Sequence, residues 1–114
     1  MKYKEQLDDL QKRTIAFLGS SGEFAEAYKR RDQGVMGNGA LTTKQKELIT
    51  LLLGVVMKCE DCLTYHASRC VRAKVSREEV VEGLILCAQM GGGPGMAYAS
   101  KALAAYDELA GPRG

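Results

Sequence analysis

Cys59 and Cys62, separated by two residues, are the side chains of this sequence best suited to chemistry. A Cys-x-x-Cys at the start of a helix is typical of redox-active dithiols, because the amides and the dipole of a helix N-terminus stabilise thiolates. His66 follows one helical turn after Cys62, within about 6 Å, where it can take the Cys62 proton directly or through one water. We therefore predict that Cys62 is the reactive thiol and Cys59 its resolving partner.

A metal site and a purely apolar role are the alternatives for these side chains. One helix face would carry four potential zinc ligands, namely Cys59, Cys62, His66 and Cys70. The first and last lie roughly 16 Å apart along a continuous helix, too far for one ion with bonds of about 2.0–2.3 Å. The chain has no second histidine, and we predict that no metal is bound. Two cysteines buried as small apolar side chains are the remaining alternative.

Glu47 is a candidate proton relay, provided that its helix packs against the cysteine helix. It stands immediately before an apolar run, so its carboxyl group would lie at the rim of the core or inside it, where it could exchange a proton with His66. The alternative is a solvated carboxylate paired with a neighbouring lysine. Cys70 and Cys87 are predicted to be small core-facing residues, with Cys70 a weaker candidate for a second redox partner.

The elements that must position these residues are predicted to be helices, because apolar residues recur at spacings of three and four. Thr42 with Gln45, and Ser76 with Glu79, form the capping-box pattern that starts a helix. The segment Leu48–Met57 of the helix that follows Thr42 is apolar on nearly every face, which is typical of a helix surrounded by protein. No stretch alternates as a strand. The predicted helices cover residues 3–18, 23–31, 43–57, 59–73, 77–90 and 96–110.

Glycine-rich stretches separate several of these helices. Residues 33–39 are predicted to be a loop, because three glycines in a short segment disfavour a helix. Gly91–Gly93 end one helix, and Pro94 suits the first turn of the next. The same cluster could either cradle an anion at a helix N-terminus or allow close helix packing. The fold class is thus all-α, a helical bundle of about six helices forming a single domain over residues 1–114.

Length and composition exclude several classes of protein. A chain of 114 residues supports one core, and some of its apolar surface is expected to need a partner subunit, so we predict a homo-oligomer. A net charge of +2, with basic and acidic residues interleaved, argues against a nucleic-acid partner. No apolar run approaches the roughly 18 residues of a membrane span, and the N-terminus has no signal-peptide pattern. We expect a cytoplasmic protein that does not bind membranes, whose cysteines are reactive thiols or metal ligands rather than structural disulfides.

The order of these motifs resembles the carboxymuconolactone decarboxylase family, and within it the alkylhydroperoxidase D-like branch. The resemblance implies an all-α antioxidant fold that forms symmetric oligomers, often hexamers built as trimers of dimers. It also implies that Glu47 and His66 relay protons, that Cys62 attacks the peroxide and that Cys59 resolves the product. Asp61 stands where the best-known peroxidase members carry a second histidine. The matching segments are Leu41–Ile49, Cys59–Cys62 with His66, Ser76–Val80 and Met90–Pro94.

These features predict an alkylhydroperoxidase-like thiol peroxidase that reduces a peroxide or similar small substrate and needs no cofactor. A dithiol reductant, of the lipoyl type if the resemblance holds, would restore the thiols. One alternative is a non-enzymatic switch, in which the disulfide changes assembly or partner binding. Another is a lactone enzyme of the decarboxylase type, although decarboxylase members of the family lack the cysteine pair.

Overall fold

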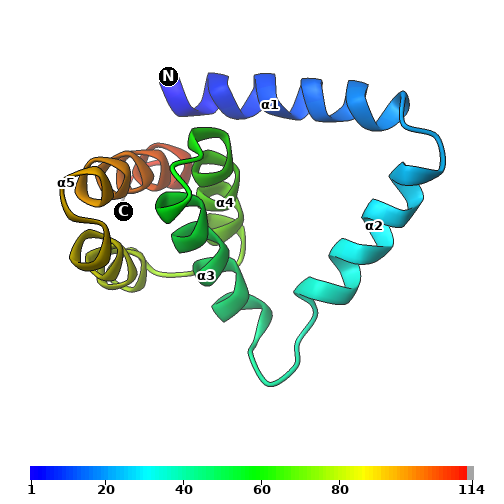
Figure 1. Ribbon diagram of the computed structural model, residues 1–114. Coiled ribbons are helices and arrows are strands. Elements are labelled where there is room, and N and C mark those ends of the chain that lie inside the picture. The colour runs from blue at the N-terminus through cyan, green and yellow to red at the C-terminus, as the bar shows by residue number, and fades with distance from the viewer. Residues whose placement is uncertain (113–114) are drawn as a thin grey trace.

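The computed structural model describes residues 1–112, and over this range the chain is helical, without strands (Figure 1). The predicted all-α fold is confirmed. The last two residues of the predicted domain, 113 and 114, lie outside the described range. No helix within residues 1–112 combines the length and apolar character needed to cross a membrane. The helices are α1 (Lys2–Gly19), α2 (Glu23–Met36), α3 (Thr43–Val56), α4 (Glu60–Arg72) and α5 (Arg77–Ala110).

The core lies between α3, α4 and α5, each of which contributes fully buried aliphatic side chains, such as Leu51, Leu63 and Val80. Both predicted capping boxes are present at the starts of α3 and α5. The prediction that protein surrounds α3 on all sides is wrong for a single chain. Three of its large side chains are 40–51% exposed, because no other helix of the described chain covers that face: Ile49, Leu53 and Val56.

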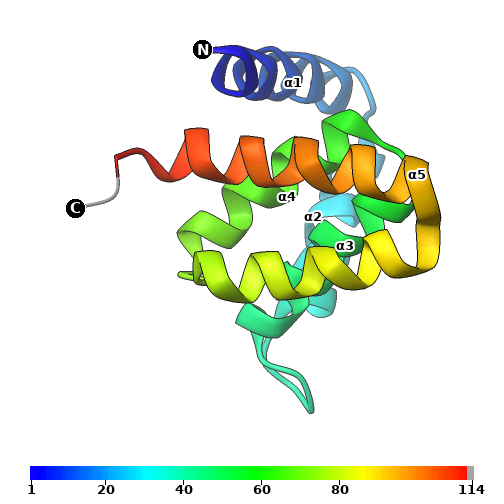
Figure 2. The same cartoon turned by 90° about the vertical axis from the view of Figure 1, so that its left-hand side faces the viewer.

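A break at Gly92 folds α5 into two antiparallel halves (Figure 2). Gly92 has φ 61° and ψ −143°, a conformation that L side chains rarely adopt. Gly95 allows the halves to approach closely, since a Cβ there would lie 2.6 Å from the carbonyl oxygen of Cys87. In this stretch Gly92 permits the break and Gly95 permits the close packing, whereas a Cβ at Gly91 or Gly93 would meet no neighbouring atom. The sequence separated the two halves as distinct helices, which is why about six helices were expected where the described chain has five.

The helix α2 is longer than predicted, and it lies away from the core (Figure 1). The expected loop over residues 33–39 is wrong for its first half, because α2 continues to Met36. Side chains of α3 satisfy the carbonyl groups at this end: Lys46 Nζ donates to the carbonyls of Val35 and Gly37, and the Thr43 hydroxyl donates to that of Met36. These bonds stabilise a helix end that its glycines alone would not favour.

Candidate active site

A tight joint between α3 and α4 places the two cysteines. Lys58 has φ 56°, and the Cys59 amide donates to the carbonyl of Gly54 at 3.0 Å, which turns the chain directly into α4. Gly54 lets the helices approach each other, because a Cβ there would lie 3.2 Å from the amide nitrogen of Leu63 and 3.3 Å from Cβ of Cys62. The start of α4 is therefore held against the end of α3.

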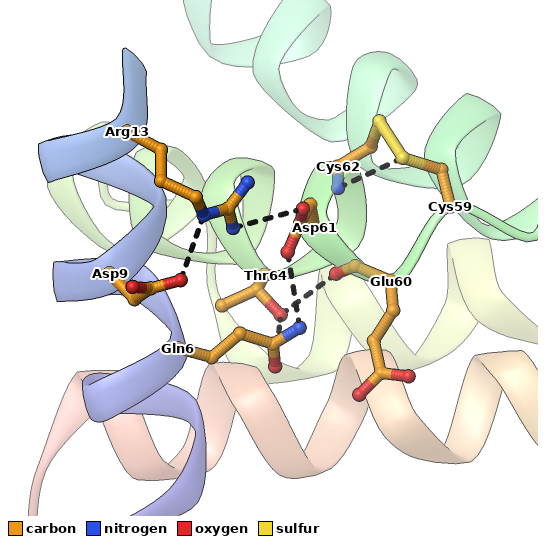
Figure 3. Close-up of polar contacts among 8 residues, drawn as sticks. All are labelled: Gln6, Asp9, Arg13, Cys59, Glu60, Asp61, Cys62 and Thr64. Atoms are coloured by element: carbon orange, nitrogen blue, oxygen red, sulfur yellow. Dashed lines mark hydrogen bonds and ion pairs between the residues drawn. A yellow bond between two sulfur atoms is a disulfide. The ribbon is translucent and has the colours of Figure 1, made fainter. Parts of the chain in front are cut away.

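Cys59 and Cys62 are joined by a disulfide at the start of α4 (Figure 3). Cys59 is the N-cap residue, and its Sγ accepts a hydrogen bond of 3.1 Å from the Cys62 amide. Their Cα atoms are 5.1 Å apart and both residues are partly exposed. The two sulfur atoms thus lie where a dithiol and a disulfide can interconvert within reach of solvent.

Side chains of α1 also contact the first turn of α4 (Figure 3). Arg13 Nη2 lies 3.2 Å from Oδ2 of Asp61, and Gln6 Nε2 lies 3.4 Å from Oδ1 of Asp61. The hydroxyl of Thr64 donates to Oε1 of Gln6 and to the carbonyl of Glu60. Asp61 is therefore engaged with α1, and the turn that carries the disulfide is tied to the N-terminal helix.

Glu47 is buried inside the core, with 2% of its side chain exposed. Its Oε2 accepts a hydrogen bond of 3.0 Å from Nε of Arg69, and its backbone carbonyl accepts one from the Cys70 thiol. Because Arg69 and Cys70 belong to the last turns of α4, these bonds place Glu47 at that end of the helix rather than at its first turn, which carries the disulfide. The carboxyl group is paired with an arginine, not with a neighbouring lysine.

His66 lies between the buried Glu47 and the disulfide along α4. Burial lowers the pKa of its imidazole, and the charge of Glu47 opposes that shift without cancelling it. The imidazole is therefore uncharged at neutral pH and can accept a proton. The ring of Tyr65 packs edge-on against it, with ring centroids 5.1 Å apart.

Two polar atoms of this cluster have no hydrogen-bond partner from the protein. They are Oε1 of Glu47 and Nδ1 of His66, and no other buried side-chain nitrogen or oxygen in residues 1–112 shares this property. A buried polar atom without a partner costs about 1–3 kcal/mol, so such atoms are uncommon unless they serve a purpose. Glu47 and His66 are therefore distinguished from the other buried polar side chains by a hydrogen-bonding capacity that the protein leaves unused.

Comparison with known proteins identifies the family. A model of the carboxymuconolactone decarboxylase family matches residues 22–105, most of the chain. The chain belongs to this family. A family protein from Legionella pneumophila is 32% identical, with a TM-score of 0.92 over 96% of this chain and 98% of that one.

Further relatives extend the likeness. A family protein from Thermotoga maritima, for which a role in the antioxidative response is suggested, is 30% identical, with a TM-score of 0.74 over 96% of this chain and 90% of that one. An uncharacterised protein of Cupriavidus necator is 42% identical over 96 residues, which cover 81% of this chain and 85% of the relative. The expected family and fold are thereby confirmed.

The remaining cysteines of this family member are free thiols buried in the structure. Burial raises the pKa of the Cys70 thiol to about 12 and also raises that of Cys87, so both stay protonated at neutral pH. Cys70 is buried and its thiol donates a hydrogen bond to the carbonyl of Glu47. Within residues 1–112, no three His, Cys, Asp or Glu side chains gather as a set that could hold a metal ion.

Arg69 is the residue of this cluster that the sequence analysis missed. It follows His66 by three residues, so on a helical projection it lies near Cys62, at about 280° when Cys59 is set to zero. That position was available from the sequence, but an arginine near a helix C-terminus is more often solvated. The ion pair also depends on how far α3 overlaps α4. The spacing of residues along α4 gives no information about that overlap.

Proposed function

We propose that this protein is a thiol peroxidase that reduces hydroperoxides through Cys62 and Cys59. In this proposal His66 is the base and Glu47 is the proton relay that supports it. The observation that supports this most directly is the disulfide at the start of α4, followed one turn later by an uncharged, half-buried His66. The antioxidative role suggested for the Thermotoga relative agrees with it. Family membership alone leaves the reaction open, because the family takes its name from decarboxylases.

The proposed reaction has three balanced steps. His66 takes the proton of Cys62, and the thiolate attacks the outer peroxide oxygen, so that the O–O bond breaks and the sulfur becomes a sulfenic acid. The leaving alkoxide or hydroxide takes the proton back from His66 and departs as an alcohol or water. The Cys59 thiol then attacks that sulfur, which forms the disulfide and releases water. A dithiol reductant, for which we propose a lipoyl-type group, takes up the oxidising equivalents by exchange and restores both thiols. The cytoplasm, where thiols are kept reduced, is the compartment we propose.

We expect the reduced protein to consume an organic hydroperoxide or hydrogen peroxide over many turnovers when dihydrolipoamide is supplied. The rate should follow protein concentration, because each disulfide must be reduced before the next peroxide is attacked. Loss of the ultraviolet absorbance of the hydroperoxide measures turnover, with reductant alone as the control. Consumption of no more than one peroxide per subunit, with reductant in excess, would refute peroxidase function.

A redox switch without turnover is the second candidate, because α1 is tied to the turn that forms the disulfide. The bonds from Arg13 and Gln6 to Asp61 give that turn a direct route to the N-terminal helix. In a switch, reduction would change the contacts of α1, and peroxide consumption would stop after one equivalent. The turnover measurement therefore separates the two candidates.

We also propose that the subunits assemble as a homo-oligomer, such as a hexamer built as a trimer of dimers. Large apolar side chains are exposed to solvent on α2 and on the end of α1, where Ile15 is 72% and Phe17 64% exposed. The outer face of α3 is exposed as well. Such contiguous apolar surface is unusual for a monomer. The large exposed side chains of these two surfaces are Ile15, Phe17, Phe24, Val35, Ile49, Leu53 and Val56.

Sedimentation velocity is expected to give a mass several times that of the 12.4 kDa chain. Phe17→Asp should reduce the assembled fraction, because it places a charge in an apolar contact. The matched control is Lys12→Asp, a charge change at an exposed position of the same helix. A monomer at micromolar concentration for the unmodified protein would contradict this proposal.

A further inference from the structure

Arg69 forms an ion pair with Glu47 that the reaction described above does not use. Its Nε lies 3.0 Å from Oε2 of Glu47, and its side chain is 28% exposed where that of Glu47 is 2% exposed. A buried carboxylate needs a positive partner, because moving a charge out of water is costly. Either the guanidinium of Arg69 or a protonated His66 could be that partner.

The electrostatic effects on His66 show that these two side chains compete. The charge of Glu47 raises the pKa of His66, and the charge of Arg69 lowers it. In turn, burial is the largest effect on the pKa of Arg69 and lowers it, but the hydrogen bond to Glu47 and the nearby negative charges together outweigh burial, so the net shift is upward. Burial is the largest effect that keeps the imidazole uncharged, and the charge of Arg69 acts in the same direction, against that of Glu47.

We propose that Arg69 is a positioning residue, which acts as the counter-ion of Glu47 and so leaves His66 uncharged and able to accept the Cys62 proton. This inference rests on the proposed peroxidase function, since it concerns the base of that reaction. An imidazolium has no free basic nitrogen, so a protonated His66 could not take the proton. In this arrangement Glu47 stays available to stabilise the imidazolium that forms once the proton is transferred.

The other groups around His66 determine the direction of the effect. Asp32 of α2 is a second carboxylate whose charge raises the pKa of His66. The ring of Tyr65 packs against His66, and burial raises the pKa of its phenol, so it is uncharged at neutral pH. Glu47, Asp32 and Arg69 are the charged groups that shift the pKa of His66. Without Arg69 only the two carboxylates would act on the imidazole, which would take up a proton and become the counter-ion of Glu47.

The test follows the imidazole itself, since His66 is the only histidine of the chain. Proton NMR of the reduced protein, recorded against pH, gives the midpoint of its titration. The unmodified protein should titrate below about 6.5, and Arg69→Gln should raise the midpoint by about one pH unit. Arg69→Lys keeps the positive charge and should keep the unmodified midpoint. Arg72→Gln, at an exposed position one turn on, is the matched control and should change nothing.

A second readout connects the titration to the thiol. The rate at which iodoacetamide alkylates Cys62 in the reduced protein should fall about two- to fivefold near pH 6.5 in Arg69→Gln, with little change well above the raised midpoint. A purely structural role would lower that rate equally at every pH and would overturn the proposal. An Arg69→Gln variant whose His66 midpoint does not rise would also overturn the proposal. So would an Arg69→Lys variant whose midpoint rises by a full pH unit. The Arg69→Lys result decides the question even if the Gln variant fails to fold. Neither readout needs a peroxide, so failure of this inference and failure of the peroxidase proposal are distinguishable.

Discussion

Cys62→Ser is expected to reduce peroxide turnover by at least about a thousandfold, because a serine hydroxyl is not ionised at neutral pH and is a poor nucleophile toward peroxide. The side chains differ by one atom and Cys62 is partly exposed, so the fold should tolerate the change. Turnover is measured with a hydroperoxide and dihydrolipoamide. Circular dichroism checks that the helical content is retained.

Two other cysteine variants make the result specific. Cys59→Ser should abolish multiple turnover but leave the first attack on peroxide, since Cys62 is still present. Cys87→Ser changes a buried cysteine that takes no part in the disulfide and should retain most of the activity. Unchanged turnover in Cys62→Ser would refute its assignment as the nucleophile. An activity that survives loss of both Cys59 and Cys62 would favour the lactone-enzyme alternative.

Glu47→Gln is expected to lower turnover by about a hundredfold, the usual scale for a group that supports proton transfer. Glutamine keeps the size of the side chain but cannot stabilise the imidazolium that His66 becomes. Because the charge of Glu47 raises the pKa of His66, its loss should lower that pKa further. The rate is lost as pH falls through the His66 pKa, so this limb of the pH profile should move to lower pH.

The direction in which the pH profile moves is the more specific part of this prediction. Arg69→Gln should move the same limb to higher pH, so the two partners of one ion pair are expected to act in opposite directions. Glu82→Gln, at an exposed position of α5, is the matched control and should leave rate and profile unchanged. Turnover of Glu47→Gln within about twofold of the unmodified protein would contradict a relay through this residue.

The local features of this fold could be predicted from the sequence, because they depend on residues close together in the chain. Both capping boxes are of this kind, as are the helix periodicity and the spacing that places Cys59 beside Cys62. The end of α2 was predicted wrongly because it is stabilised from a distance, by hydrogen bonds from Lys46 and Thr43 to its last carbonyl groups.

The parts of the site that were not predicted depend on how α3 overlaps α4. Whether Glu47 is solvated or buried follows from the contact of Gly54 with the start of α4, which sets the overlap of the two helices. The same overlap brings Arg69 to the carboxylate. The exposure of one face of α3 was missed for another reason: an apolar helix surface indicates that it is covered, but not whether by its own chain or by another.

The intact mass of the reduced protein after one equivalent of hydrogen peroxide tests the central claim most directly. The unmodified protein should lose two hydrogen atoms as the disulfide forms, Cys59→Ser should gain one oxygen atom on Cys62, and Cys62→Ser should keep its mass. These results would place the first chemical step on Cys62 and the second on Cys59. An unmodified protein whose mass does not change, or a Cys62→Ser variant that gains oxygen as fast as Cys59→Ser, would contradict the account.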